Sequence, residues 1–415
     1  MLLCLVGSEM CIRDSYKTTA YQFNNTEHAA NLFGLKEFGN IYSRLGNPTV
    51  GALEARLTAL EEGAMCVALS SGTSAVMYSL INIMSQGDNF VTANQLYGGT
   101  YTMFDNILPE YGIDSKKVDI TDLAAVENAI DDKTRAIYCE TITNPGLVVA
   151  DISALSEIAH SKGIPLIVDA TFTTSAILKP FEYGADIVVY SLTKWMSGHG
   201  RVIAGAVIEK GGFDWGNGNF PLYDKPDTSY GGMRWGHDLG DLGNVAYSLR
   251  LRTVPLRNLG ANMGPETAFE VLSGLETLGL RMERHCENAI KAAEYLSNHE
   301  LVEWVRFPGL KDDPAYELSE KYLKGTGGTM VVFGIKGGKD AGQKFIDNLK
   351  MFRHVANVGD TRSLAIHPAS TTHSQLDDEQ LVAAGAPPEL VRLSIGIEDI
   401  EDIIEDLTQA LESTK

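Results

Sequence analysis

The chain has 415 residues, enough for two or three domains that each bury a core of their own. It carries 34 Lys and Arg against 54 Asp and Glu, a formal net charge of −20. A surface this acidic repels nucleic-acid backbones and anionic lipid headgroups, so we expect neither nucleic-acid binding nor membrane binding. No apolar run approaches the roughly 20 residues that a bilayer-spanning helix needs.

Five cysteines are spread along the chain, an odd number with no CxxC spacing. This usage excludes a disulfide scaffold and a zinc finger, and it is typical of the reducing cytosol, so we expect a cytoplasmic protein. The first stretch, MLLCLVGSEMCIRDS, lacks the basic start and the cleavage pattern of a signal peptide and resembles a translated sequencing adaptor. We expect residues 1–15 to be non-native and residues 16–46 to form an N-terminal arm.

Helical and strand-like patterns alternate from Asn47 onward. Asn47 as a cap and Pro48 at a first helical position predict a helix over PTVGALEARLTALEE, with its apolar residues on one face. Five short apolar runs predict strands. In chain order they are residues 65–69, NFVTA near Val91, RAIYCE near Ile137, IPLIVDA near Ile167 and ADIVVYS near Val188. Helical stretches lie between them, for example at residues 152–162. This alternation predicts an α/β fold with a mostly parallel sheet that is buried on both faces.

The pattern loosens in the second half of the chain. The segment Gly211–Trp235, rich in Gly, Trp, Tyr, Asp and Pro, predicts a long loop, and a long helical stretch follows over about residues 265–299. A strand-like run at Thr329–Ile335 and an acidic helix from Asp399 predict a smaller α+β domain at the C-terminus. We expect the two domains to span residues 47–255 and 256–415.

Several motifs of nucleotide-binding and hydrolytic enzymes are absent, because the chain has no GxxxxGK[ST], HExxH or GxSxG. The stretch LSSGTSA instead places Ser70–Thr73 between a predicted strand and a predicted helix. Backbone N–H groups at a helix start, with small residues that allow close approach, bind anions such as phosphate. Turns of this kind are also common without a ligand, so this motif alone leaves the question open.

Two charged residues follow the ends of predicted strands. Asp169 ends the strand PLIVDA, at the edge where open α/β sheets bind ligands, although a helix cap or a solvated strand end would explain it equally well. Lys194 in YSLTKW follows the next strand, 25 residues later, either as a surface lysine or as an amine that forms a Schiff base and moves protons. Together with LSSGTSA they indicate one cofactor. Pyridoxal 5'-phosphate (PLP) needs a lysine for attachment, an aspartate for its ring nitrogen and an anion site for its phosphate.

These motifs identify the chain as similar to the Cys/Met-metabolism family of PLP-dependent enzymes, which have fold type I. The resemblance runs from about Tyr16 to the C-terminus and is strongest to the branch that replaces the acetoxy group of O-acetylhomoserine with sulfide. The stretches that carry it are IYSRLGNPTVGALEARLTALE, SSGTSA, LYGGTY, ETITNP, SLTKWMSGHG, LRTVPLRNLGA, GLETLGLRMERHCENA, NVGDTRSL, HPASTTHSQL and RLSIGIEDIEDII.

The resemblance implies a role for each residue of the cofactor site. Lys194 would bind the cofactor covalently and shuttle protons, and Tyr97 would stack on its ring as a second catalytic residue. Asp169 would pair with the ring nitrogen, and Asn144 would touch the ring hydroxyl. The phosphate would be held by the backbone amides of Gly72 and Thr73, the hydroxyls of Ser191 and Thr193, and, from the neighbouring subunit, Tyr42 and Arg44.

The substrate and the assembly are also implied by the resemblance. Arg392 would clamp the substrate carboxylate in the bidentate geometry that Arg favours, with Asn357 nearby. Because Tyr42 and Arg44 would complete the site of a neighbouring subunit, we expect at least a dimer, and a homotetramer as a dimer of active dimers. No metal ion is expected.

The implied activity is a γ-replacement in which sulfide or another thiol displaces acetate from O-acetyl-L-homoserine and gives L-homocysteine, a step of methionine and cysteine biosynthesis. A cystathionine γ-synthase or a γ-lyase would use the same residues, although YGGT lacks the cysteine associated with methionine γ-lyases. A binding protein without catalysis on this fold is a remote alternative, which the intact Lys194 and Asp169 disfavour.

Three positions depart from the family pattern. Ala170 stands where the family usually has Asn, Arg201 follows SGHG in place of a small or acidic residue, and the loop at Ser229–Gly232 reads SYGG in place of SYHG. None of these changes removes a group to which we assign chemistry. Three histidines in motif loops could contact the substrate or only stabilise their loops: His199, His367 and His373.

Overall fold

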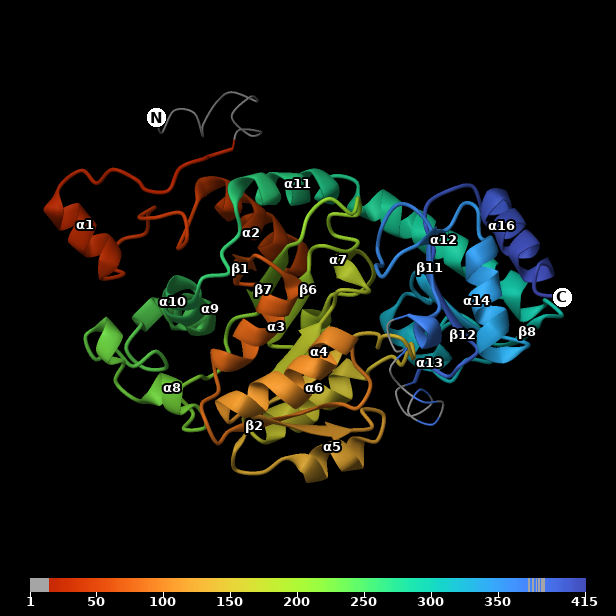
Figure 1. Cartoon of the computed structure of the whole chain (residues 1–415). Helices are drawn as coiled ribbons and strands as arrows, with labels where there is room; N and C mark the ends of the chain where they lie inside the picture. Colours follow the sequence, from red (N-terminus) through yellow and green to blue (C-terminus); the bar gives the residue numbers. More distant parts are fainter. Residues whose placement is uncertain (1–14, 372–373, 375–376, 378, 380, 382–384) are drawn as a thin grey trace.

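The structure is a computed structural model that describes residues 15–371, 374, 377, 379, 381 and 385–415. Two sheets form two lobes, and the N-terminal arm with α1 (Thr26–Phe33) extends away from both (Figure 1). Apart from Ser15, the segment predicted to be non-native lies outside the described residues, as does His373. Within the described chain, no helix is both long and apolar enough to cross a bilayer.

A seven-stranded sheet forms the centre of the large lobe, in the order β1-β7-β6-β5-β4-β2-β3. Its strands are β1 (Met65–Leu69), β2 (Asn89–Ala93), β3 (Asp114–Val118), β4 (Thr134–Glu140), β5 (Leu166–Asp169), β6 (Ile187–Ser191) and β7 (Gly205–Glu209). The pairs from β3 to β6 are parallel, whereas β7 runs antiparallel to β6 and β1. The predicted α/β fold with a mostly parallel sheet is therefore confirmed. The sequence patterns miss β3 because this edge strand, DSKKV, is polar and only partly buried.

Ten helices of the described chain belong to the large lobe. They are α2 (Pro48–Glu61), α3 (Gly72–Ile81), α4 (Gly98–Thr102), α5 (Leu123–Ala129), α6 (Ile152–Ser161), α7 (Thr174–Ile177), α8 (Pro221–Asp224), α9 (Ala246–Leu251), α10 (Arg257–Leu259) and α11 (Pro265–Leu275). Four of them (α2, α3, α5 and α6) begin at a side-chain cap. The predicted cap of α2 is confirmed, because Asn47 Oδ1 accepts the Thr49 N–H at 2.9 Å. The face of α2 with Val50, Leu53 and Leu57 is buried, as its spacing predicts.

The segment Gly211–Trp235 is largely irregular, as predicted, but it is fixed by buried aromatic rings. Trp215 stacks on Tyr223 and Tyr247 at centroid separations of 5.0 and 5.1 Å. Trp235 is fully buried as well. The long loop is thus part of the core of the large lobe, since offset aromatic stacking adds to the stabilisation from burial.

A five-stranded sheet forms the small lobe, in the order β10-β11-β12-β9-β8. Its strands are β8 (Val302–Arg306), β9 (Met330–Ile335), β10 (Arg353–His354), β11 (Leu364–Ile366) and β12 (Leu390–Ser394), and its helices are α13 (Tyr316–Tyr322), α14 (Gly338–Asn348) and α16 (Ile400–Glu412). The strand predicted over residues 329–335 is β9. The predicted acidic helix is α16, and Asp399 caps it by accepting the Glu401 N–H at 3.1 Å.

The helix α12 (Leu278–Ser297) joins the two lobes (Figure 1). The helical stretch predicted over residues 265–299 is divided into α11 and α12, which are separated at residues 276–277. Along α12, side chains up to Cys286 pack into the core of the large lobe, and those from Ala289 onward pack into the core of the small lobe. The domain boundary at residues 255/256 stays a prediction.

The buried carboxyl group of Glu61 makes the stability of the large lobe depend on pH. Glu61 ends α2, is 1% exposed and accepts a hydrogen bond from the Tyr190 hydroxyl. Burial raises its pKa to about 7. A carboxyl group whose pKa is higher in the folded state than in the unfolded state stabilises the fold while it is protonated. This contribution, on the order of 3 kcal/mol in the free energy of unfolding, is complete below about pH 4.5 and is lost as the pH rises through about 7.

We therefore expect the melting temperature of Glu61→Gln, relative to that of the parent, to be higher at pH 8 than at pH 5, because glutamine cannot ionise. The control is Glu157→Gln, since Glu157 is an exposed carboxylate on α6 of the same lobe. Thermal unfolding at both pH values checks this. An equal effect of Glu61→Gln at both pH values would show that Glu61 does not ionise in this range.

Candidate active site

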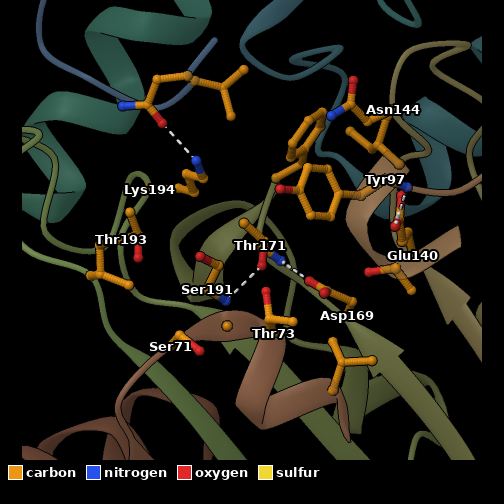
Figure 2. Close-up of a pocket in the computed structure, with 18 of the residues that line it drawn as sticks. Ser71, Thr73, Tyr97, Glu140, Asn144, Asp169, Thr171, Ser191, Thr193 and Lys194 are labelled. Carbon is orange, nitrogen blue, oxygen red and sulfur yellow. Dashed lines mark hydrogen bonds between the residues drawn. The ribbon is translucent and has the colours of Figure 1, made fainter. Parts of the chain in front are cut away.

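A cavity of about 360 Å³ opens where the carboxyl ends of β4, β5 and β6 meet the start of α3 and the edge of the small lobe (Figure 2). Ligands of open α/β sheets bind at such strand ends. The cavity is lined by Ser71, Gly72, Thr73, Val76, Tyr97, Thr100, Glu140, Ile142, Asn144, Asp169, Thr171, Phe172, Ser191, Thr193, Lys194, Ile203, Ala356, Asn357, Val358 and Arg392. Every residue predicted for the site is among them except Tyr42 and Arg44.

Lys194 lies in the turn after β6, and its amine points into the cavity. Its Nζ donates a hydrogen bond to Asn357 Oδ1 at 2.6 Å. The turn that carries it is closed by the Gly198 N–H, which donates to the Lys194 carbonyl at 2.8 Å. Burial, with the positive charge of Arg392, lowers the pKa of the Lys194 amine to about 8. An amine with this pKa is available as a nucleophile and as a proton carrier near neutral pH.

Asp169 is the last residue of β5. Its carboxylate accepts the Thr171 N–H at 2.9 Å and the Tyr138 hydroxyl at 3.4 Å. Burial raises its pKa, while the hydrogen bonds from Thr171 oppose this shift. A buried carboxylate of this kind is stabilised by a cationic partner such as a protonated ring nitrogen. Ala170, one of the departures from the family pattern, is fully buried and does not line the cavity.

The start of α3 and the end of β6 form a cradle for an anion. The first N–H groups of a helix have no partner within the helix and favour negative charge. A Cβ on Gly72 would lie 2.5 Å from Ser191 Cβ, so only glycine allows this close approach. Ser191 is positioned by its own N–H, which donates to Thr171 Oγ1 at 2.8 Å. Together with the Thr193 hydroxyl, this cradle fits a phosphate group.

Tyr97 and Asn144 face the cavity from two neighbouring loops. The Tyr97 side chain is 50% exposed, and the Tyr97 N–H donates to Glu140 Oε1 at 2.8 Å. Glu140 ends β4 and is 6% exposed. Glu140 was not among the predicted site residues, although it is the last residue of the strand-like run RAIYCE, just as Asp169 is the last residue of its own strand.

Arg392, in the middle of β12, brings a cation from the small lobe to the cavity. Its Nη1 donates to Asn144 Oδ1 at 2.9 Å, and its Nη2 donates to the Asn357 carbonyl at 3.4 Å. Burial lowers its pKa to about 10, so the guanidinium stays charged at neutral pH. A buried guanidinium without a carboxylate partner is suited to bind a carboxylate in the fork geometry of arginine.

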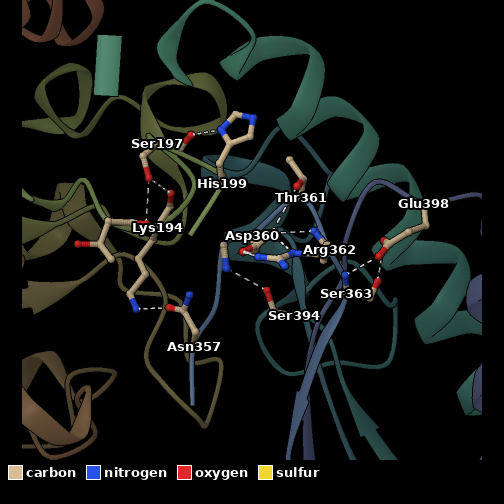
Figure 3. Close-up of polar contacts among 12 residues, drawn as sticks. Lys194, Ser197, His199, Asn357, Asp360, Thr361, Arg362, Ser363, Ser394 and Glu398 are labelled. Carbon is tan, nitrogen blue, oxygen red and sulfur yellow. Dashed lines mark hydrogen bonds and ion pairs between the residues drawn. The ribbon is translucent and has the colours of Figure 1, made fainter. Parts of the chain in front are cut away.

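The loop at residues 357–363 presents Asn357 to the Lys194 amine (Figure 3). It is held by the Gly359 N–H to Ser394 Oγ (3.0 Å), the Ser363 N–H and hydroxyl to Glu398 (2.7 and 2.9 Å) and the Thr361 N–H to the Gly198 carbonyl (2.9 Å). Contacts from both lobes therefore fix the partner of the lysine.

Tyr42 and Arg44 lie outside the cavity of their own chain. The Arg44 Nη1 donates to the Arg257 carbonyl at 2.7 Å, and its guanidinium lies 5.4 Å from the centre of the Tyr42 ring. Tyr42 is 41% exposed on the arm. This placement agrees with a role toward another subunit, which stays a prediction.

Arg201 and two of the histidines also lie away from the cavity lining. Arg201 pairs with Glu270 at 3.6 Å, and its side chain is 67% exposed. The His199 ring contacts the Ser197 carbonyl at 2.6 Å, and the fully buried His367 lies between Ser370 and the Pro388 carbonyl. The geometry favours the loop-stabilising alternative for His199 and His367.

The described residues fit the phosphate, the ring and the reactive carbon of PLP. The cradle at Gly72 fits the phosphate, the buried Asp169 carboxylate fits a ring cation, and the Lys194 amine fits a carbonyl carbon. No group of three or more His, Cys, Asp or Glu that could hold a metal ion occurs among the residues that the structure describes.

Comparisons with known proteins agree over nearly the whole chain. The family of Cys/Met metabolism PLP-dependent enzymes matches residues 9–412. An O-acetyl-L-homoserine sulfhydrylase of Leptospira meyeri is 47% identical over 96% of this chain and 91% of its own length. O-acetyl-L-homoserine sulfhydrylase 1 of Thermus thermophilus is also 47% identical, over 95% of this chain and 94% of its own.

A solved structure from Campylobacter jejuni superposes with a TM-score of 0.93 at 39% identity and covers 99% of both chains. It is assigned as an O-acetylhomoserine (thiol)-lyase and carries a pyridoxyl-lysine monophosphate group. The likeness extends over both lobes of the present chain, because the coverage is nearly complete.

The depressed pKa of Lys194 can be measured directly on cofactor-free protein. Only the neutral amine reacts with an acylating reagent, so a lower pKa brings reactivity at a lower pH. We expect the pH profile of Lys194 acylation, measured by mass spectrometry, to have its midpoint near pH 8. The acylation of exposed lysines should have its midpoint above about pH 10. Arg392→Met should raise the Lys194 midpoint, because it removes a neighbouring positive charge. A Lys194 midpoint equal to that of exposed lysines would contradict the desolvation of this amine.

Proposed function

The chain belongs to the family of Cys/Met metabolism PLP-dependent enzymes, and from this premise we propose that it is an O-acetyl-L-homoserine sulfhydrylase. The enzyme breaks the bond between the γ-carbon and the acetoxy oxygen of O-acetyl-L-homoserine, forms a bond from the γ-carbon to sulfur, and releases acetate and L-homocysteine. The observation that carries the proposal is the Lys194 amine, which is buried in the cavity, hydrogen-bonded to Asn357 and in the same cavity as the charged guanidinium of Arg392.

The cofactor would be held by the groups described above. Lys194 would bind it covalently, Asp169 would face its ring nitrogen, and the cradle at Gly72, Thr73, Ser191 and Thr193 would hold its phosphate. Tyr97 would cover the ring, and Asn144 would contact the ring hydroxyl. When bound, PLP withdraws electrons from the α-carbon of an amino acid, which makes protons on the α- and β-carbons removable.

The residues of the chain then bind the substrate and move protons. Arg392 binds the substrate carboxylate, and Asn144 and Asn357 hold the guanidinium in place. The Lys194 amine takes the α-proton, since its depressed pKa keeps a usable fraction neutral at physiological pH. Asn357 holds this amine on the side of the substrate carboxylate.

The proposal includes an assembly in which two subunits complete each site. The arm carries exposed rings, with Phe33 at 47%, Phe38 at 67% and Tyr42 at 41%, and exposed apolar groups that cluster on one segment favour a partner surface. Tyr42 and Arg44 would reach the phosphate of the neighbouring subunit, in a dimer of active dimers. A cytoplasmic location is supported by three free, buried cysteines in the described chain: Cys66, Cys139 and Cys286.

Product analysis tests the reaction itself. With O-acetyl-L-homoserine and PLP, homocysteine should accumulate only when sulfide is added, and Lys194→Ala should lower the rate at least a thousandfold because the α-proton loses its acceptor. The formation of 2-oxobutyrate and ammonia with or without sulfide would show a lyase instead. Cysteine in place of sulfide yielding cystathionine at a higher rate would show a cystathionine synthase.

Complementation between two inactive variants tests the shared site. Arg44→Ala and Lys194→Ala should each be at least tenfold less active than the parent. A mixed dimer of the two has one site with both residues intact, so random reassociation should restore about a quarter of the parental sites. Activity that does not recover in verified mixed oligomers would place Arg44 in the site of its own chain. Lys17→Ala mixed with Lys194→Ala is the control for reassociation, because Lys17 is exposed on the same arm.

A further inference from the structure

One buried carboxyl group in the cavity is not used by the mechanism above. Glu140 ends β4 and pairs in register with Asp169 on β5, so the two carboxyl groups lie on neighbouring strand ends. Both groups line the cavity. Burial and the neighbouring Asp169 carboxylate raise the pKa of Glu140 well above its usual range, and no cation lies close enough to oppose this within the described chain.

A buried carboxyl group without a cation is costly, and hydrogen bonds must compensate for its loss of water. Glu140 Oε1 accepts the Tyr97 N–H at 2.8 Å (Figure 2), and the backbone N–H of Asn144 also stabilises the carboxylate. These two N–H groups belong to different loops. Tyr97 precedes α4 in the loop after β2, and Asn144 lies in the loop after β4.

We propose that Glu140 is a positioning residue that holds the Tyr97 loop and the Asn144 loop together at the cavity. The proposal rests on the proposed function, because Tyr97 and Asn144 are the two residues that would contact the cofactor ring. Without the acceptor, the N–H groups of Tyr97 and Asn144 lose a hydrogen-bond partner. Tyr97, whose side chain is half exposed, then also loses the hydrogen bond that ties its backbone to the end of β4.

The acceptor must also have the right reach. Glu140 Oε1 accepts its hydrogen bond from the Tyr97 N–H, which lies in the loop after the neighbouring strand β2. The side chain of aspartate is shorter by one C–C bond, so its oxygens would lie roughly 1.5 Å farther from this N–H. Glutamine keeps one acceptor oxygen at the full reach and removes the charge. The two variants therefore separate the position of the acceptor from its charge.

The experiment compares full-length holoenzymes of Glu140→Gln, Glu140→Asp and Glu140→Leu with the parent. Two rates are measured, neither of which requires turnover: the loss of PLP on dilution, followed by absorbance, and the amide hydrogen exchange of the peptide that contains Tyr97. Glu209→Leu is the matched control, because Glu209 is an equally buried carboxyl group that ends β7 and accepts the Ser248 N–H at 2.8 Å, outside the cavity lining.

We expect Glu140→Leu and Glu140→Asp to lose PLP at least tenfold faster than the parent and to exchange the Tyr97 peptide at least tenfold faster. Glu140→Gln should stay within threefold of the parent in both rates, and Glu209→Leu should lower the melting temperature without changing either rate. Should Glu140→Leu fail to fold, the comparison of Asp with Gln decides the matter.

Two results would overturn the proposal. If both rates rise as much in Glu140→Gln as in Glu140→Leu while Glu140→Asp behaves like the parent, Glu140 acts through its charge. If both rates in all three variants equal those of the parent, Glu140 has no positioning role. A parent protein that does not bind PLP at all would refute the proposed function instead, so the two failures are distinguishable.

Discussion

The site depends on the removal of one lysine amine from water. Lys194 follows β6 at the carboxyl edge of the sheet, where the small lobe covers it, and this burial lowers the pKa of its amine to about 8. In bulk water the same amine would be protonated at neutral pH and would be a poor nucleophile. The sheet of the large lobe positions the Lys194 amine, and the small lobe shields it from water. Neither lobe alone would give Lys194 this environment.

The other charges of the cavity are arranged around that amine. Asp169 and the start of α3 bring a carboxylate and free N–H groups from the large lobe. Arg392 and Asn357 bring a guanidinium and an amide from the small lobe, and both contact each other as well as the large lobe. The helix α12 contributes side chains to the hydrophobic cores of both lobes. Its packing therefore fixes the two lobes, and with them Lys194 and Arg392, relative to each other.

Much of this arrangement was predictable from the sequence, because buried parallel strands are apolar runs and the residues after them meet at one edge. Asp169 and Lys194 follow such runs directly. Arg392 and Asn357 follow no comparable signal, since Arg392 lies in the middle of β12, which is antiparallel to both of its neighbours, and Asn357 lies in a loop of the same mixed sheet. Only the resemblance to a family pointed to these two residues. Glu140 is the opposite case, because it ends a strand-like run and lies in the motif ETITNP, yet the resemblance implied no role for it.

The parts that could not be predicted are those determined by tertiary packing. The edge strand β3 is polar, and β7 is antiparallel within a parallel sheet, so neither follows from a local pattern. Trp215 and Tyr223 look like ordinary loop residues until they stack in the core. The direction of the arm with Tyr42 and Arg44 has no local signal in the sequence.

The central claim is that Lys194 is the attachment point of the cofactor, and the most direct measurement is chemical. Holoenzyme reduced with borohydride, digested and mapped by mass spectrometry should carry one pyridoxyl phosphate group, on the peptide that contains Lys194. A group found on another lysine, or a protein that retains none after reconstitution with PLP, would contradict the account of the site given by its geometry.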